Sequence, residues 1–159
     1  MHALSWPDEL LTAQLPRFRQ AGVSVLFLES FSDRQQPILN AYFESPTEAN
    51  FSKIKAAAAE RNAVFSEAEQ NLVRTSVANQ IRPIGIEMHR PDDRLDVRDD
   101  YWVKTISSYL KSNPETTWIA FVGATHLEGG GFYPSYVGVD QKLSAPSLRL
   151  ESVRPRKEH

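Results

Sequence analysis

Apolar positions along this chain follow two different spacings, and their alternation predicts helices separated by strands. The largely apolar runs Val23–Leu28 and Trp118 to Gly123 are typical of strands buried on both faces. Ile81–Met88 is predicted as the strand between them, with Pro83 placing its early part unpaired or at a sheet edge. Because strands separated by helices favour a parallel sheet, we expect an α/β fold, a three-layer sandwich with a mainly parallel sheet flanked by helices.

Apolar residues at helical spacing predict the helices of this domain. Ser66–Glu69 forms a capping box that begins one of them, and Pro16 is expected to kink or shorten the first. The polar stretch Arg90–Asp96 is predicted to be a loop, and Leu148–Val153 alternates like a final strand. The expected helices cover residues 7–20, 34–44, 47–61, 66–77 and 98–112.

Composition favours a soluble globular protein and excludes several classes of site. The chain has 159 residues, 41% of them hydrophobic and 24% charged, which predicts one domain with a substantial core. A net charge of -2 gives no electrostatic basis for binding nucleic acid or an anionic membrane. The chain has no cysteine, which excludes disulfides, thiolate metal sites and a cysteine nucleophile. We expect a single domain over residues 1–153 and a charged tail over 154–159, with no signal peptide and no membrane-spanning segment.

Three ionisable side chains follow the ends of the three predicted strands. Glu29 and Glu87 end the first two, and His126 comes three residues after Gly123, where the third strand ends. Since parallel strands place their carboxyl ends at one edge of the sheet, these groups should converge there. Two carboxylates beside an imidazole can hold a divalent metal or perform general acid–base chemistry. The structural alternative is that each residue merely caps the element that follows it.

Arginines and aspartates alternate around the start of the predicted helix at Arg98. This pattern is most often a solvated surface with local salt bridges. The functional alternative is that Arg98 or Asp99 points into the cleft, because helix starts line such clefts. The sequence has no Gly-x-Ser-x-Gly, Gly-x-Gly-x-x-Gly, Walker or His-Glu-x-x-His motif, which argues against the corresponding hydrolase, nucleotide-binding and zinc-protease classes.

Several segments together resemble the superfamily of ChaN-like, Tiki and erythromycin-esterase proteins. They are WIAFVGATHLEGG, FYPSYVGV, LRLESV, GVSVLFLES, NQIRPIGIEM and RDDYWVKTI. The nearest likeness is to domains embedded in large bacterial toxins and effectors of the dermonecrotic, membrane-targeted type. The resemblance maps Glu29 onto the family's glutamate, and Gly123 and His126 onto its second Gly-x-x-His motif.

One departure from the family pattern concerns the first Gly-x-x-His motif. The chain begins Met1-His2, and His2 stands at about the right distance before Glu29 to be the first motif histidine. The strand, glycine and acidic residue that precede this histidine in the family would then be missing. We therefore expect either that the chain is a fragment or that this protein dispensed with the strand.

The resemblance implies a hydrolase domain of a bacterial toxin or effector that cleaves a peptide, ester or amide bond. His126 would be a general base or metal ligand and Glu29 a second ligand or the group that orients a water, with His2 completing a site for zinc, manganese or iron. Glu87 is assigned to acid–base work and Arg98 to oxyanion stabilisation. Gly123 is assigned to cofactor binding, and the substrate would be a small molecule or a peptide.

Two alternatives from other classes stay open. In the first, His126 ligates haem iron or a metal without turnover, and the glycine-rich stretch Gly129–Gly131 opens beside the flat ligand. In the second, the chain is a non-catalytic effector segment that binds a host or partner protein, because a missing strand leaves an open sheet edge. The sequence does not fix the localisation. The resemblance is consistent with secretion as part of a larger bacterial toxin or effector.

Overall fold

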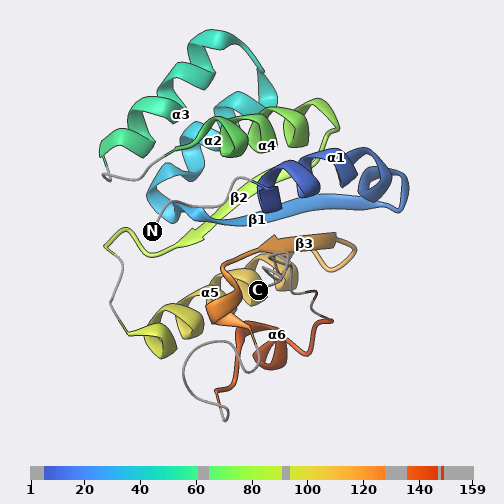
Figure 1. The fold of residues 1–159 in the computed structure, drawn as a ribbon, viewed down its shortest axis with the longest axis vertical. Helices are drawn as coiled ribbons and strands as arrows, with labels where there is room; N and C mark the ends of the chain where they lie inside the picture. The colour runs from blue at the N-terminus through green and yellow to red at the C-terminus, as the bar shows by residue number, and fades with distance from the viewer. Residues whose placement is uncertain (1–5, 61–64, 91–93, 128–135, 147, 149–159) are drawn as a thin grey trace, which may run out of the picture.

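A computed structural model describes residues 6–60, 65–90, 94–127, 136–146 and 148. Three strands within these residues form one parallel sheet, as the sequence predicted (Figure 1). They are β1 (Val23–Ser32), β2 (Arg82–Glu87) and β3 (Thr117–Phe121). Apart from Leu148, the predicted final strand and the charged tail lie outside the described residues.

The strand order is β2-β1-β3, with β1 in the centre. The chain therefore moves from β1 to one side, and then crosses back over β1 to reach β3 on the other side. Right-handed crossovers in opposite directions place their helices on opposite faces of the sheet. A parallel sheet that reverses direction in this way binds ligands beyond the carboxyl ends of its strands, at the point of reversal. Glu29 lies close to that point, directly after Leu28, where the regular pairing of β1 with both neighbours ends.

Helices cover both faces of the sheet and complete the predicted three-layer sandwich (Figure 1). Four helices form the layer on one face, and two form the layer on the other. The first layer consists of α1 (Trp6–Gln20), α2 (Gln36–Glu44), α3 (Glu48–Glu60) and α4 (Glu67–Ala78). The second consists of α5 (Leu95–Ser112) and the short α6 (Val139–Lys142).

Alternate residues of β1 divide the hydrophobic core into two clusters. Leu26 and Leu28 pack with the helices of the first layer, whereas Val25 and Phe27 pack toward Trp102 of the second. Successive side chains of a strand point to opposite faces, which explains why the whole strand is apolar. Burial on both sides is therefore a direct consequence of the apolar run that predicted this strand.

The structure corrects three details of the sequence-based prediction. Strand β1 continues past its predicted end at Glu29 to Ser32. Helix α1 continues through Pro16 to Gln20, so the expected shortening is wrong. A proline removes one helical hydrogen bond, and the burial of Leu11 and Leu15 against the core offsets that loss. Helix α5 begins at Leu95 rather than Arg98, so the end of the predicted 90–96 loop is helical.

The predicted start of α4 is confirmed. Ser66 precedes this helix, and its side chain accepts a hydrogen bond from the Glu69 N–H at 3.1 Å. The Glu69 carboxylate in turn accepts the Ser66 N–H at 3.1 Å. This reciprocal pair satisfies two backbone donors that would otherwise lack partners at the beginning of the helix.

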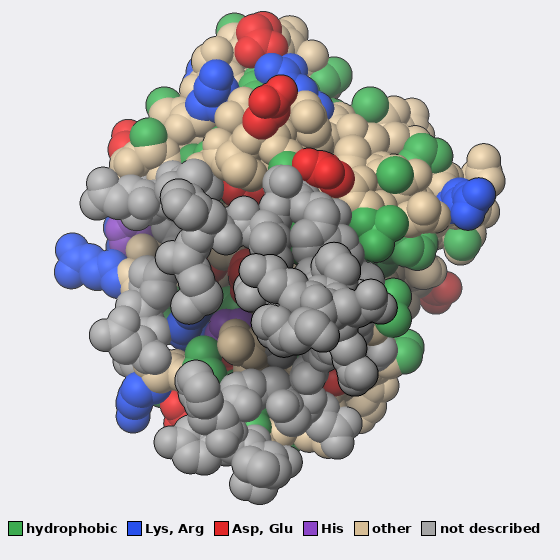
Figure 2. Space-filling model, in the orientation of Figure 1, with side chains coloured by type: hydrophobic (Ala, Val, Ile, Leu, Met, Phe, Trp, Pro, Cys, Tyr) green, Lys and Arg blue, Asp and Glu red, His purple; other side chains and the backbone are tan. Residues whose placement is uncertain are grey.

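Charged and apolar side chains are interspersed on the face of the molecule that Figure 2 displays. Among the described residues, large apolar side chains with substantial exposure are few and scattered: Leu10, Val137 and Leu148. Within the same residues, no helix combines the length and the apolar character needed to cross a membrane.

Candidate active site at the carboxyl edge of the sheet

The ends of β1 and β3 are joined by a hydrogen bond from backbone to carboxylate. Gly123 follows β3, and its N–H donates to Glu29 Oε2 at 3.1 Å. A Cβ added to Gly123 would lie 3.5 Å from Glu29 Oε1 and 3.7 Å from His126 Cδ2. The Gly123 backbone therefore lies against both side chains, which brings Glu29 and His126 to one place, as the sequence predicted.

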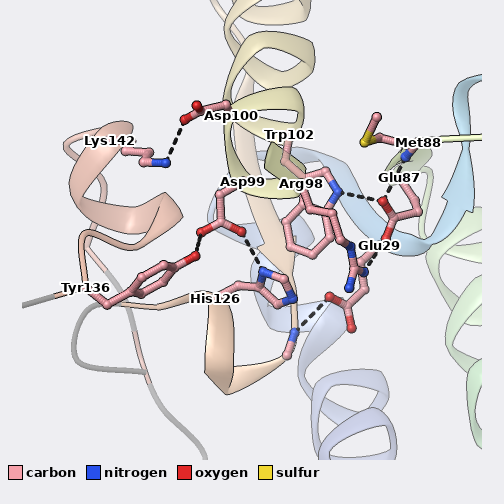
Figure 3. A network of polar contacts seen from close by, with 11 residues as sticks. Glu29, Glu87, Met88, Arg98, Asp99, Asp100, Trp102, His126, Tyr136 and Lys142 are labelled. Atoms are coloured by element: carbon pink, nitrogen blue, oxygen red, sulfur yellow. Dashed lines mark hydrogen bonds and ion pairs between the residues drawn. The ribbon is translucent and has the colours of Figure 1, made fainter. Parts of the chain in front are cut away.

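His126 is held by a buried carboxylate. It ends the short 3₁₀ helix η2 (Ala124–His126), and its Nδ1 lies 2.5 Å from Asp99 Oδ1 (Figure 3). Both side chains are buried. Because a carboxylate accepts hydrogen bonds, the contact assigns the proton to Nδ1 and leaves a lone pair on Nε2. No described residue gives Nε2 a hydrogen bond, and Figure 3 shows this nitrogen on the side of the ring nearer Glu29.

Asp99 has a second donor on its other oxygen. The Tyr136 hydroxyl, from the segment that precedes α6, donates to Asp99 Oδ2. Burial and the nearby Asp99 carboxylate raise the pKa of Tyr136 above its ordinary value, so this hydroxyl keeps its proton at neutral pH. Tyr136 and His126 thus hold the Asp99 carboxylate between them (Figure 3).

Trp102 connects this pair to the end of β2. Its ring packs against the His126 imidazole with centroids 4.3 Å apart, and its Nε1 donates to Glu87 Oε1 at 3.2 Å. Glu87 is buried and also accepts the Met88 N–H at 2.8 Å. Its other oxygen pairs with Nη2 of Arg98. Since donors occupy both of its oxygens, Glu87 is arranged to position Arg98 and Trp102, and the predicted acid–base role stays a prediction.

Arg98 lies between the two glutamates. Figure 3 shows its guanidinium extending from α5 past Glu87 toward Glu29. The guanidinium carbon is 5.1 Å from the centre of the Trp102 ring. Its Nε is buried and has no hydrogen-bond partner among the described residues. Buried donors normally have a partner, so an unpaired Nε among the described residues is unusual at this position.

Glu29 has a perturbed affinity for protons. Burial raises the pKa of this carboxyl above its usual range, while the Gly123 N–H and electrostatic interactions with His126 and Arg98 act in the opposite direction. Glu87 adds a smaller upward effect. A carboxyl held in this way beside an imidazole and a guanidinium is typical of functional sites.

Two of the three predicted metal ligands, Glu29 and His126, are among the described residues. A metal-binding histidine usually donates its other ring N–H to a carboxylate, and the Asp99–His126 contact has that form. Glu29 is the predicted second ligand, but a catalytic zinc has three protein ligands, and no group of three potential ligands occurs among the described residues. His2, the predicted third ligand, lies outside the described residues, so its placement stays a prediction.

The sequence analysis named most of these residues but did not assign the catalytic arrangement. It gave Asp99 only as an alternative to Arg98 for the side chain that points into the cleft. Helical spacing indicates more strongly that Asp99 is buried. Asp99, Trp102 and Ile106 lie three and four residues apart and are the buried residues of α5. An aspartate on that apolar face requires a partner. Tyr136 was missed, because its segment has no periodic pattern to place it.

Comparison with known proteins gives no assignment: no protein-family model, curated protein or solved structure matches this chain. The resemblance to the ChaN-like and Tiki superfamily therefore remains a prediction based on short motifs. The class of site must be inferred from its geometry.

Proposed function

We propose that this protein is a hydrolase of an ester, amide or peptide bond and that His126 is its general base. The observation that carries the proposal is the buried contact between Asp99 and Nδ1 of His126. It fixes the ring and leaves Nε2 on the side of Glu29, at the sheet edge where α/β proteins bind ligands. An imidazole oriented by a buried carboxylate is a recurring arrangement for removing a proton from a nucleophile.

Each residue of the site has its own role in the proposed reaction. His126 Nε2 removes a proton from a water that attacks the carbonyl carbon, while Glu29 accepts the other hydrogen of that water and orients it. Arg98 stabilises the negative charge that develops on the carbonyl oxygen. The carbon–oxygen or carbon–nitrogen bond then breaks, and His126 returns its proton to the leaving group. Glu87 and Trp102 are positioning residues: Glu87 holds Arg98, and Trp102 packs against His126.

A matched pair of aspartates tests the proposal. Asp99→Asn keeps the shape of the side chain but removes the charge that fixes the His126 tautomer. Asp100→Asn makes the same change in the adjacent residue, whose carboxylate is exposed and pairs with Lys142. The assay is hydrolysis of p-nitrophenyl acetate and butyrate and of a set of fluorogenic peptide amides. We expect Asp99→Asn and His126→Gln to lose about 10²–10⁴-fold in rate, and Asp100→Asn to stay within about twofold.

Some outcomes would contradict the proposal. If wild type and His126→Gln have equal rates in every assay, His126 is not the general base. The same conclusion holds if neither protein shows any hydrolysis. Equal losses in Asp99→Asn and Asp100→Asn would mean that charge at the start of α5 matters rather than the contact with His126. Circular dichroism and thermal unfolding of each variant separate loss of chemistry from loss of fold.

A metal-dependent form of the same hydrolase is supported by the carboxylate–histidine contact, which leaves Nε2 able to ligate a cation. A bound zinc, manganese or iron would supply a Lewis acid and an activated water. Elemental analysis of protein purified without a polyhistidine tag tests this form. Stoichiometric metal that is lost in Glu29→Gln and His126→Gln supports it, and retention of the metal in both variants contradicts it. The toxin or effector setting and the haem alternative rest on the resemblance and remain predictions.

A further inference from the structure

A concave surface lies at the same edge of the sheet as the candidate active site. It is a cavity of about 490 Å³ at the carboxyl end of β2, lined by Arg34, Met88, His89, Arg90 and Tyr101. The cavity joins the 3₁₀ helix η1 (Asp33–Gln35), the residues after β2 and the first turns of α5. Figure 2 shows basic and histidine side chains next to one another at the left edge, where Figure 1 places the end of β2.

The basic side chains of this cavity have no ion pairs within the described part of the chain. Arg34, His89 and Arg90 are exposed, and no described carboxylate pairs with any of them. Three arginines elsewhere in the molecule do have carboxylate partners: Arg74 with Glu48, Arg82 with Glu44 and Arg98 with Glu87. Two guanidinium groups and an imidazole around one cavity are therefore available to a ligand.

Among the acidic residues adjacent along the chain to this lining, Asp33 makes a hydrogen bond within its own turn. Its Oδ1 accepts the backbone N–H of Arg34 at 2.8 Å, which holds this side of the carboxylate in the turn of η1. Burial and then the Asp33 carboxylate raise the pKa of the Tyr101 phenol, which places Asp33 on the side of that ring. The Tyr101 ring and the Met88 side chain add apolar surface to the basic lining.

Glu87 joins Met88, a residue of the cavity lining, to the candidate active site. The Met88 N–H donates to Glu87 Oε1, and the other Glu87 oxygen holds Arg98. Tyr101 lies on α5 between the residues that contribute to the active site, Arg98 and Asp99 on one side and Trp102 on the other. The cavity lining and the candidate active site are therefore built from neighbouring residues of the β2 end and of α5.

We propose that this cavity is a specificity subsite that binds an anionic group of the substrate, a carboxylate or a phosphate, through Arg34 and Arg90. The planar guanidinium fork matches both anions, and its hydrogen bonds to them are charge-assisted. The substrate class that follows is a hydrolysable ester or amide with a negatively charged group on one side of the scissile bond. In that respect the inference rests on the proposed hydrolase function, whereas anion binding itself does not require turnover.

Anion binding can be measured on the whole chain by NMR titration at constant ionic strength. The probes are sodium succinate, inorganic phosphate and neutral succinamide. We expect one or both anions to shift the backbone amides of Met88 and His89, and succinamide to leave them unchanged. Arg34→Gln and Arg90→Gln should each weaken binding at least about fivefold. Arg17→Gln is the matched control, because Arg17 is exposed on α1 and makes the same charge change far from the cavity along the chain.

Comparing succinate with phosphate tells whether the anionic group of the substrate is a carboxylate or a phosphate. Tighter binding of succinate supports a carboxylate-bearing substrate, and tighter binding of phosphate supports a phosphorylated one. The subsite is overturned if succinamide binds as well as succinate, if neither anion shifts Met88 and His89, or if Arg17→Gln weakens binding as much as Arg34→Gln. The His126→Gln variant should retain full anion binding, so failure of the hydrolase proposal and failure of the subsite give different results.

Discussion

The two faces of the sheet bury polar groups of different kinds. In the layer of α1 to α4, the buried Gln35 donates to the Ala57 carbonyl and the buried Ser76 to the Val73 carbonyl. These are neutral side chains that complete backbone hydrogen bonding. In the layer of α5 and α6, the buried polar residues Glu87, Asp99 and His126 are ionisable and contact other side chains.

On the proposed function, this difference separates the polar residues that stabilise the fold from those that take part in the chemistry. A neutral side chain bonded to the backbone stabilises the structure by about 1 kcal/mol and has no proton to exchange near neutral pH. A buried ionisable group costs free energy unless it is paired, and its pairing is then available to orient an imidazole or a guanidinium. Substitutions in the first layer should therefore change stability, whereas polar substitutions in the second should change activity.

The largest effect is expected for His126→Gln. It removes the base while keeping a side chain that can hydrogen-bond Asp99, so we expect the hydrolytic rate to fall by about 10²–10⁴-fold. The free energy of unfolding should change much less than the activation free energy. Rates on the best ester or amide substrate, together with urea denaturation, make the comparison. A variant that unfolds as it loses activity would place His126 among the structural residues instead.

Phe51→Ala should give the opposite result in the first layer. Phe51 is fully buried, its ring centre is 5.2 Å from that of Tyr42, and the Arg74 guanidinium lies 3.6 Å from the Phe51 ring centre. Removing the ring leaves a cavity and should lower the free energy of unfolding by about 3–5 kcal/mol. Urea denaturation measures the loss. Activity per folded molecule should be unchanged. A loss of activity without a loss of stability would contradict the assignment of the first layer to stability alone.

Two glycines form a matched pair for the next test. A Cβ on Gly85 would lie 2.7 Å from the Phe31 carbonyl oxygen, which must then move with β1, so Gly85→Ala should cost about 1–3 kcal/mol. At Gly123 the nearest atom would be 3.5 Å away, an ordinary contact. Gly123→Ala should therefore stay within about 1 kcal/mol of wild type. Thermal unfolding of both variants tests the difference. Equal losses of stability would show that the close contact around Gly85 does not determine the effect of Gly85→Ala.

Tyr136→Phe should have a smaller effect on stability than Gly85→Ala. It removes one donor from Asp99 and leaves the His126 contact in place, so we expect a loss of about 1 kcal/mol. The rate of hydrolysis should fall by roughly tenfold at most, because Asp99 is held less firmly. Steady-state kinetics and urea denaturation measure the two quantities. A rate as low as that of Asp99→Asn would instead give Tyr136 a role in the chemistry itself.

Asp8, at the start of α1, is an ionisable exception in the first layer. Burial, and then the nearby Glu69 carboxylate, raise the pKa of Asp8 from 3.8 to about 6. The folded state therefore binds this proton more tightly than the unfolded state. The resulting stability is fully present below pH 3.8 and is lost as the pH rises through about 6.

Replacing Asp8 with asparagine should remove this part of the pH dependence. The free energy of unfolding of Asp8→Asn, relative to wild type, should increase as the pH rises from about 4 to about 7. Glu9→Gln is the control, since the neighbouring Glu9 is exposed. Urea denaturation at several pH values measures the difference. Parallel curves for wild type and Asp8→Asn would show that Asp8 does not carry the effect.

Short-range patterns were sufficient to predict the fold. The apolar run of β1, the capping box of α4 and the helix-strand alternation each follow from local sequence, and together they imply a parallel sheet. The convergence of Glu29, Glu87 and His126 followed from the rule that parallel strands end at one edge. Glu87 ends β2, His126 follows β3, and Glu29 directly follows the regularly paired part of β1, so the topology brought them together.

The remaining features depend on contacts between distant parts of the chain. The Asp99–His126 contact joins residues 27 positions apart, and Tyr136 reaches Asp99 across 37. No local spacing encodes these pairs. The continuation of α1 through Pro16 likewise depends on packing of Leu11 and Leu15 against the core. Local propensity favours an interruption there, and tertiary burial overrides it.

The protonation of His126 can be measured directly, without a substrate. In alkaline buffer, ¹⁵N NMR of labelled protein should show a protonated Nδ1, held by Asp99, and an unprotonated Nε2 available as a base. In Asp99→Asn this preference should be lost, while Asp100→Asn should match wild type. A wild-type ring that carries its proton on Nε2, with a bare Nδ1, would contradict the assignment of His126 as a general base oriented by Asp99.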